Sequence, residues 1–345
     1  MIISEAAIAT RRPPPNASPR WRGLLAAIAV LLPLLLAGCA GSEEPPLRVA
    51  TIPWIGYQPL HLAADRGEFR TEDIRLARFA SNVESLRAIR NGNVDVAALT
   101  LDEALLLRAD GHDIRVILLL DYSHGGDAIL AQPGITRITD LKDRRVGVEN
   151  DAATAYLLAR GLEYGGLDRE AIQIVRVDAG RHAEAFRDQE IDALATFEPI
   201  RTRLLKDGAE ELFDSTKIPG EIVDVLVARR AALDEHPGHL RKLVNGWFSA
   251  LNHLDAEPGP ARTRMAANSD LSEDELETAL SGVRFPSRAE NCEALARDGE
   301  SLRSTTQRLA DLMLGQGLLE RQVDLDRLFD DRVLQASGCP ETAGG

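Results

Sequence analysis

Residues 94–103 read VDVAALTLDE and residues 191–200 read IDALATFEPI, two versions of one pattern. In each, an aspartate opens an apolar run of strand length, and a segment with helical spacing follows. Asp95 and Asp192 are 192 − 95 = 97 residues apart, and the match extends without a gap across 90–111 of the first copy. The chain repeats a strand–turn–helix unit, which predicts two similar lobes.

Strand-like and helix-like segments alternate on both sides of this repeat. The run at 114–120 is apolar throughout, as expected of a parallel strand with both faces buried. Such alternation indicates βαβ units and parallel sheets, and therefore an α/β fold. A Gly-Gly pair interrupts the pattern near 122–128, and a strand predicted over 221–233 returns the chain to the first lobe. Two chain crossings are expected to form a hinge between the lobes, and the C-terminal region has a helical pattern.

Composition and charge narrow the class of protein. The chain has 345 residues, 44% of them hydrophobic, which is typical of a globular protein with about two domains. The net charge of −14 argues against a nucleic acid partner, because phosphate binding needs clustered Lys and Arg.

The N-terminus has the parts of an export signal. Four arginines precede an apolar segment at 23–36, which is too short to be a permanent membrane span. The segment ends in LAGC at 36–39, which resembles the lipobox of bacterial lipoproteins. This resemblance implies that Cys39 becomes the mature N-terminus and carries lipid, including palmitate, at the periplasmic or extracellular face of a membrane. The alternative is an ordinary cleaved signal with a chance cysteine.

The cysteine count favours one disulfide. An exported protein enters an oxidising compartment, and Cys292 and Cys339 are the two thiols left besides the proposed lipidation site. We expect them to pair and to link the C-terminal tail to the last helical region, and two unrelated thiols are the alternative. The expected organisation is a lipoprotein signal peptide at 1–38, a tether at 39–46, the first part of lobe 1 at 47–124, lobe 2 at 125–220, and the return strand and C-terminal helices of lobe 1 at 221–340.

Six segments occur in order along the chain: GYQPLHLAADRGEF (56–69), IRNGNVDVAALTLDEALLL (89–107), DYSHGGDAILA (121–131), DLKDRRVGVE (140–149), DALATFEP (192–199) and IPGEIVDVLVARR (218–230). Together they resemble the solute-binding proteins of ABC importers, in the nitrate/sulfonate/taurine group. The resemblance implies a type II periplasmic-binding-protein fold with two α/β lobes. It also implies a monomer that delivers a small solute to a membrane permease and its ATPase, without a cofactor and without chemistry on the solute.

The ends of the predicted strands supply the candidate binding residues. In open parallel sheets a ligand binds beyond the carboxyl ends of the strands, and two facing sheets would form a cleft that closes by a hinge. An aromatic residue beside a glycine gives a flat surface that suits a small planar or compact solute. Packing between the lobes and helix capping are the alternative roles. The candidates are Trp54, Gly56, Tyr57, Ser81, Asn82, Thr100, Asp102, Asp121, Tyr122, Glu149, Asp151, Thr154, Phe197, Glu198 and Asp224.

The strand ends carry many acids and almost no Lys or Arg. A nitrate or a bare sulfonate would need basic groups or free helix N-termini, so the acids favour a solute with an amine. Two candidates are a taurine-like aminosulfonate, whose sulfonate would lie at a helix start, and an aminopyrimidine precursor of thiamine. The acids expected to converge on the cleft are Asp102, Asp121, Glu149, Asp151, Glu198 and Asp224.

Other functions are disfavoured. His236 and His239 have a metal-like spacing, but Pro237 and Gly238 separate them, and no acid or third His is expected near them, so no metal site is expected. No nucleotide-binding P-loop occurs. The rival from the enzyme class is a thiamine-pyrimidine synthase, which the export signal and the lack of a His/Cys cluster in the cleft disfavour. A sensor that signals instead of transporting is the second rival.

Overall fold

This computed structural model describes residues 44–149, 152–296 and 299–339. The chain divides into two units after Glu44, and the helices and strands below belong to the unit that begins at Pro45. The signal segment, Cys39 and the start of the tether lie outside the described residues, as does Asp151. Among the helices of the described ranges, none combines the length and the hydropathy needed to span a bilayer.

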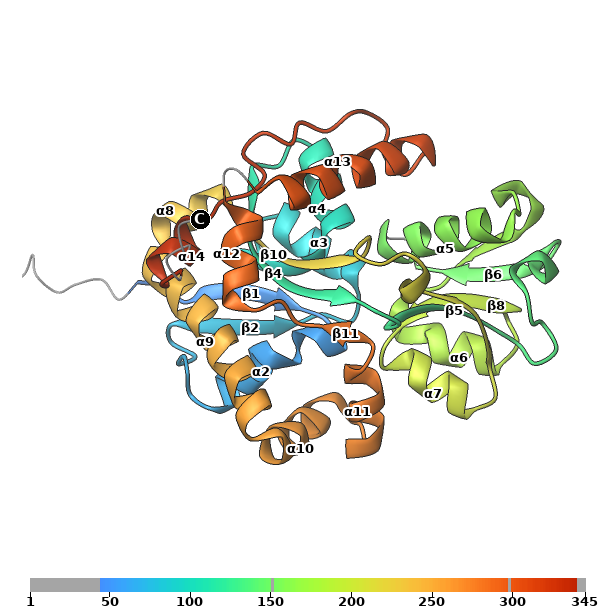
Figure 1. Ribbon diagram of the computed structural model, residues 1–345, viewed down its shortest axis with the longest axis horizontal. Helices are drawn as coiled ribbons and strands as arrows, with labels where there is room; N and C mark the ends of the chain where they lie inside the picture. Colours follow the sequence, from blue (N-terminus) through green and yellow to red (C-terminus); the bar gives the residue numbers. More distant parts are fainter. Residues whose placement is uncertain (1–43, 150–151, 297–298, 340–345) are drawn as a thin grey trace, which may run out of the picture. The chain divides into compact units, whose positions relative to one another are not determined.

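Lobe 1 is built on a six-stranded sheet with the order β11-β4-β10-β3-β1-β2 (Figure 1). Strand β1 pairs in parallel with β2 and β3, whereas β10 runs antiparallel to β3 and β4. The strands are β1 (Leu47–Thr51), β2 (Ile74–Arg78), β3 (Val96–Thr100), β4 (Ile114–Ser123), β10 (Val223–Arg229) and β11 (Val283–Arg284).

Lobe 2 is built on a five-stranded sheet with the order β7-β6-β8-β5-β9. Strand β6 pairs in parallel with β7 and β8, and β5 runs antiparallel to β8. All residues of β5 and β8 are buried, which explains their continuous apolar sequences. The strands are β5 (Asp127–Ala131), β6 (Arg145–Val148), β7 (Gln173–Arg176), β8 (Ala193–Phe197) and β9 (Glu210–Asp214).

The two sheets share one topology, as the sequence repeat predicts. The order β2-β1-β3-β10 in lobe 1 matches β7-β6-β8-β5 in lobe 2. Within each of these sets of four strands, the antiparallel strand, β10 or β5, is the one that arrives from the other lobe, because β10 follows β9 and β5 follows β4 along the chain. The chain therefore crosses between the lobes twice.

The repeat extends to a pair of equivalent ion pairs. Arg48 donates from Nη2 to Asp95 Oδ1 at 2.7 Å, and Arg145 donates from Nη2 to Asp192 Oδ1 at 3.1 Å. Both arginines also donate their backbone N–H to the same carboxylate, at 3.0 and 2.8 Å. Each aspartate thus joins the start of one strand to the chain just before the neighbouring parallel strand. The aspartates of the repeated pattern hold the sheets together and do not face the cleft.

Helices cover both faces of the sheets, and the C-terminal ones pack on lobe 1. The predicted strand over 221–233 is too long: β10 ends at Arg229, where its last pairing partner on β4 is Ile114, and a helix begins at Arg230. The helices are α2 (Gln58–Asp65), α3 (Asn82–Arg90), α4 (Leu101–Ala109), α5 (Ala152–Gly165), α6 (His182–Arg187), α7 (Ile200–Lys206), α8 (Arg230–Glu235), α9 (Pro237–Ala256), α10 (Pro258–Ser269), α11 (Glu273–Leu280), α12 (Arg288–Leu295), α13 (Glu300–Gly315) and α14 (Arg332–Ala336).

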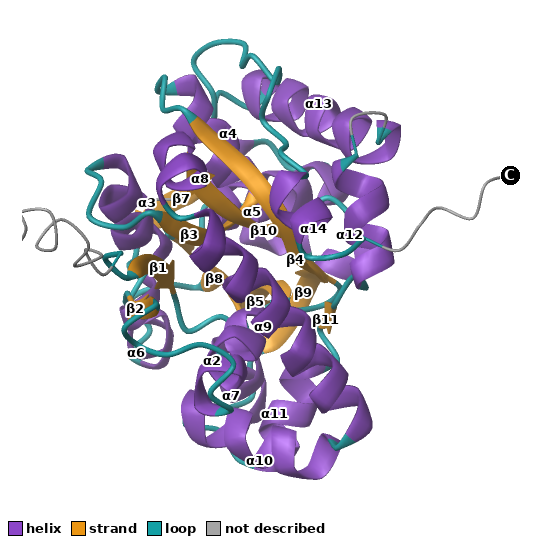
Figure 2. Cartoon of the chain, turned by 90° about the vertical axis from the view of Figure 1, so that its left-hand side faces the viewer, coloured by secondary structure: helices purple, strands orange, loops and turns teal. Residues whose placement is uncertain are grey.

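A disulfide joins the C-terminal segment to lobe 1. Cys292 of α12 and Cys339, which follows α14, are bonded, with their Cα atoms 5.9 Å apart. Helices α12 and α14 contact each other and β4 (Figure 2). The bond therefore closes the segment that contains α13 and the following loop.

The lobes are in contact in this structure. Helix α7 of lobe 2 lies against the C-terminal helices of lobe 1, where Lys206 pairs with Glu275 at 2.9 Å. Arg203 also donates to the backbone oxygen of Asp270 at 3.0 Å. These contacts describe a closed arrangement, and residues at the strand ends face each other across it.

Candidate functional site

A small cavity lies between the lobes, where the parallel strands of both sheets end. Its volume is about 20 Å³, which is room for about one water molecule. A solute with several heavy atoms can enter this interlobe cavity only if the lobes move apart. The lining residues are Ile52, Trp54, Tyr57, Asn82, Thr100 and Asp224 from lobe 1, and Asp127, Ala153 and Phe197 from lobe 2.

Two aromatic rings meet across the cavity. Trp54 follows β1, and Phe197 is the last residue of β8. Their ring centroids are 6.0 Å apart with an interplanar angle of 79°, an edge-to-face contact between the lobes. Opening of the lobes would separate the rings and expose two aromatic surfaces to the cavity.

Gly56 allows the chain to pass close to a buried carboxylate. A Cβ atom at this position would lie 2.0 Å from Oδ2 of Asp121 and 2.4 Å from Nε1 of Trp54. Any larger residue would displace both side chains. The glycine in the GYQ sequence is therefore required by packing behind the cavity.

Two buried aspartates lie at the cavity: Asp224 lines it, and Asp121 lies directly behind its wall, against the indole of Trp54. Asp121 of β4 and Asp224 of β10 are cross-strand partners, and both side chains are buried. Trp54 Nε1 lies 3.2 Å from Asp121 Oδ2, and the Tyr57 hydroxyl donates a hydrogen bond to Asp224. We call these two aspartates the acid pair.

Burial disfavours the charged form of the acid pair. It raises the pKa of Asp121 to about 8, and the charge of Asp127 adds to this effect, while hydrogen bonds from Trp54 and Asp224 oppose it. Burial also raises the pKa of Asp224 well above its ordinary value, followed by the charge of Asp121. Because neighbouring buried carboxylates do not readily ionise together, the pair holds a proton at neutral pH. A cation beside the pair would favour ionisation.

Two buried oxygen atoms in the cavity wall can accept further hydrogen bonds. Among the described residues, Asn82 Oδ1 has no hydrogen-bond partner, and Thr100 Oγ1 has none besides the backbone N–H of Glu103 in the capping box of α4. Leaving a buried polar atom unsatisfied costs about 1–3 kcal/mol. Both atoms are therefore suited to accept hydrogen bonds from a bound solute.

The structure places some of the predicted binding residues at the interlobe cavity and others elsewhere. Ser81 instead caps α3, where its Oγ accepts from the backbone N–H of Glu84 at 3.3 Å. Thr154 accepts from the backbone N–H of Glu149 at 3.1 Å. The predicted residues that line the cavity or lie directly behind it are Trp54, Gly56, Tyr57, Asn82, Thr100, Asp121, Phe197 and Asp224.

The expectation that six acids converge on the cleft needs correction. Of these acids, only the acid pair is found at the cavity among the described residues. Glu198 is buried in lobe 2, and its carboxylate accepts hydrogen bonds from the first turn of α7. Asp102 and Glu149 are buried but do not line the cavity. Glu198 thus follows a strand as predicted, but its carboxylate serves the start of α7 and not the cavity.

Tyr122 also lies elsewhere. It follows Asp121 on β4, and successive strand residues point to opposite faces. Its ring lies under the guanidinium of Arg284, with the Arg284 Cζ 4.4 Å from the ring centroid. It lines a different cavity of about 590 Å³ near the chain crossings.

Sequence reasoning missed Asp127. It is the first residue of β5, is buried, and lines the cavity beside Phe197, its pairing partner on β8. Because β5 is antiparallel, its first residue lies at the edge where the parallel strands end. Its position directly after the Gly-Gly pair at the chain crossing could have identified Asp127 as a candidate from the sequence.

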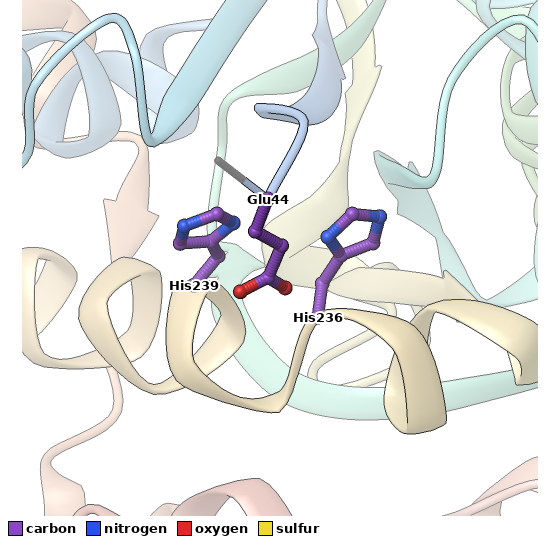
Figure 3. A group of neighbouring side chains, drawn as sticks. All are labelled: Glu44, His236 and His239. Atoms are coloured by element: carbon purple, nitrogen blue, oxygen red, sulfur yellow. The ribbon is translucent and has the colours of Figure 1, made fainter. Parts of the chain in front are cut away.

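The His236 and His239 rings stack at the start of α9, with centroids 5.8 Å apart (Figure 3). The expectation that no acid is nearby is wrong, since Asp73 Oδ1 lies 3.6 Å from His239 Nε2. Asp73 also accepts from Lys242 at 2.8 Å. This acid already belongs to an ion-pair cluster.

Solved structures with this fold include binding proteins and an enzyme. The alkanesulfonate-binding protein SsuA of Xanthomonas axonopodis pv. citri, bound to MOPS, aligns with a TM-score of 0.69 and 20% identity, over 82% of this chain and 97% of that chain. The desulfurization enzyme DSZB aligns with a TM-score of 0.60 and 17% identity, over 85% of this chain and 98% of its own. These likenesses confirm the predicted two-lobed type II periplasmic-binding-protein fold.

One relative found by sequence matches only about half of the chain. The taurine-binding periplasmic protein of Escherichia coli (strain K12) is 24% identical over 184 residues, which is 52% of this chain and 57% of that protein. The chain thus matches little more than half the length of this relative. The profile of the NMT1-like family matches residues 40–269. Because this match covers more than half of the sequence and agrees with the six motif segments, the chain belongs to the NMT1-like family.

Proposed function

We propose that this chain is the extracytoplasmic solute-binding component of an ABC importer and that its solute carries an amine or another cationic group. The acid pair is the observation that carries the choice of solute. Asp127 adds a third acid, and the lining residues that the structure describes include no Lys, Arg or His. Burial disfavours the ionised form of these acids, and a cationic group at this position would stabilise that form.

The cavity wall suits the rest of such a solute. A planar group can stack on the face of one of the two rings, Trp54 or Phe197, once the lobes separate, because aromatic faces stack on flat apolar groups. Asn82 and Thr100 supply acceptors for N–H groups of the solute. An aminopyrimidine uses all three features, and an aminosulfonate such as taurine uses the acids and the acceptors.

The cellular setting completes the proposal. We place the protein in the cell envelope, anchored through lipid on Cys39, as a monomer that hands its solute to a permease driven by an ATPase. The family membership and the names of similar binding proteins support this role. An enzyme remains the second candidate function because DSZB has the same fold.

Calorimetric titration with a solute panel tests the proposal. The panel contains taurine, an aminomethyl-aminopyrimidine, ethanesulfonate and nitrate. We expect an amine to bind, and Asp224→Asn to weaken its binding by about tenfold or more because a buried charge partner is lost. Asp255→Asn on the exposed face of α9 is the matched control. Tight binding of nitrate or ethanesulfonate with none of the amines would refute the choice of solute.

The same titration separates binding from catalysis. Mass spectrometry of the solute recovered after incubation should show the unchanged compound. Recovery of a converted product would support the enzyme instead.

A further inference from the structure

A second cavity, of about 500 Å³, lies between the lobes and shares no lining residue with the interlobe cavity. Arg87 and Arg90 from the last turn of α3 line it on lobe 1. Arg169, which precedes β7, and Arg176, the last residue of β7, line it on lobe 2. We call this cavity the arginine groove.

The groove is basic in a protein whose net charge is −14. Arg90 pairs with Asp110 at 2.8 Å. Within the described parts of the chain, no carboxylate pairs with the guanidinium of Arg87, Arg169 or Arg176. The one acid in the described lining is Glu149, which is 1% exposed. Guanidinium groups are well suited to bind carboxylate and sulfonate oxygens through paired hydrogen bonds.

Apolar side chains form the other part of the wall. Leu86 and Leu106 contribute from lobe 1, and Ile174 contributes from lobe 2. The volume of the groove falls in the range of small-molecule sites, about 300–1,000 Å³. A lining of apolar side chains with guanidinium groups matches a ligand that has an apolar body and an anionic head.

We propose that the arginine groove binds an organic anion with an apolar body, of the alkyl sulfonate or alkyl carboxylate class. The site is separate from the cavity with the acid pair. Because both lobes supply its arginines, the anion makes all of its contacts only when the lobes are closed. Binding of the anion therefore stabilises the closed form and increases affinity for a solute held between the lobes.

Calorimetric titration of the full chain with hexanesulfonate tests this site. We expect saturable binding, and a loss of about tenfold or more in affinity for the double variant Arg87→Gln/Arg176→Gln, because one charged hydrogen-bonding group is removed from each lobe. The double variant Arg241→Gln/Arg321→Gln changes two exposed arginines outside the groove and should bind as the parent does. Inorganic sulfate, which lacks the apolar body, should bind more weakly than hexanesulfonate.

The Asp224→Asn variant separates the two sites. Hexanesulfonate binding that survives in this variant but falls in Arg87→Gln/Arg176→Gln supports the groove. Binding that falls in Asp224→Asn but survives in the arginine variant places the sulfonate between the lobes and overturns the proposal. Absence of binding, or equal affinity in both arginine variants, also overturns it. Amine binding by the Arg87→Gln/Arg176→Gln variant is measured in parallel, so failure of the groove leaves the proposed solute class independently tested.

Discussion

The acid pair predicts that a cationic solute displaces a proton when it binds. Burial raises the pKa of Asp121 to about 8, so the empty cavity retains a proton at neutral pH. A cation beside the carboxylates favours their ionised form. The proton and the cation therefore compete for the same pair of side chains.

The size of this competition follows from the pKa. Each pH unit below about 8 adds about 1.4 kcal/mol to the free energy needed to remove the proton. At pH 6 the total is about 2.7 kcal/mol. Because about half of the molecules already hold the proton at pH 8, the solute is expected to bind about fiftyfold more weakly at pH 6 than at pH 8. The sign is fixed because a group with a raised pKa keeps its proton below that pKa and loses it above. Tyr57 faces the pair but stays neutral over this range because burial and the charge of Asp224 raise its pKa, and Asp127 and Glu103 add negative charge nearby.

Calorimetry at several pH values measures this effect directly. The amine that binds most tightly in the panel is titrated between pH 6 and pH 8, in buffers with different heats of ionisation. We expect release of about one proton per solute at pH 6 and a decrease in that number toward pH 8. Asp121→Asn should remove most of the pH dependence, because the amide oxygen still accepts from Trp54 while the titrating group is gone. Affinity that is independent of pH, or uptake of a proton on binding, would refute the reasoning.

Three further predictions concern packing and stability. Burial lowers the pKa of His61 and of His182 to about 4. The free energy of unfolding should therefore be unaffected by these histidines above pH 6.5 and should fall as the pH drops toward 4, by about 3 kcal/mol per histidine. In urea unfolding at several pH values, the free energy of unfolding of His182→Asn should change less steeply with pH than that of the parent. Gly56→Ala should abolish amine binding while leaving far-ultraviolet circular dichroism unchanged, because the new methyl group displaces the side chains of Asp121 and Trp54. Replacing Cys292 and Cys339 by Ser should lower the free energy of unfolding by about 4 kcal/mol, as expected for the loss of a cross-link that spans 47 residues, and a denaturant titration that shows no change would contradict this.

The two-lobed fold could be predicted because the sequence repeats at the level of sheet topology. The pattern around Asp95 recurs at Asp192, and each aspartate forms the equivalent ion pair in its own lobe. Continuous apolar runs marked the buried strands, and glycines marked the ends of helices. The C-terminal end of β10 could not be predicted from the sequence, because the Ala and Leu residues after Arg229 are compatible with a strand or a helix. Only the end of the pairing with β4 decides between them.

The site could be predicted only in part because a strand end fixes the position of a backbone and not the direction of a side chain. Asp121 lies directly behind the cavity, where it contacts Trp54, whereas the next residue, Tyr122, points to the opposite face of β4. Glu198 also follows a strand, but the first turn of α7 supplies donors that hold its carboxylate inside lobe 2. Asp127 escaped notice because it begins an antiparallel strand, and a search of parallel strand ends does not reach it.

The acid pair also links solute capture to closure of the lobes. In an open cleft, water would solvate both carboxylates, and their pKa would lie near the ordinary value for Asp. Closing an empty cleft at pH 7 then requires uptake of a proton by a group whose pKa in water is about 3.8, which costs about 4 kcal/mol. Closing around a cation avoids this uptake, because the bound charge compensates the carboxylates. Under the proposed function, the residues that bind the cation would thus also disfavour closure without one, and the closed form would indicate to the proposed permease that the solute is present.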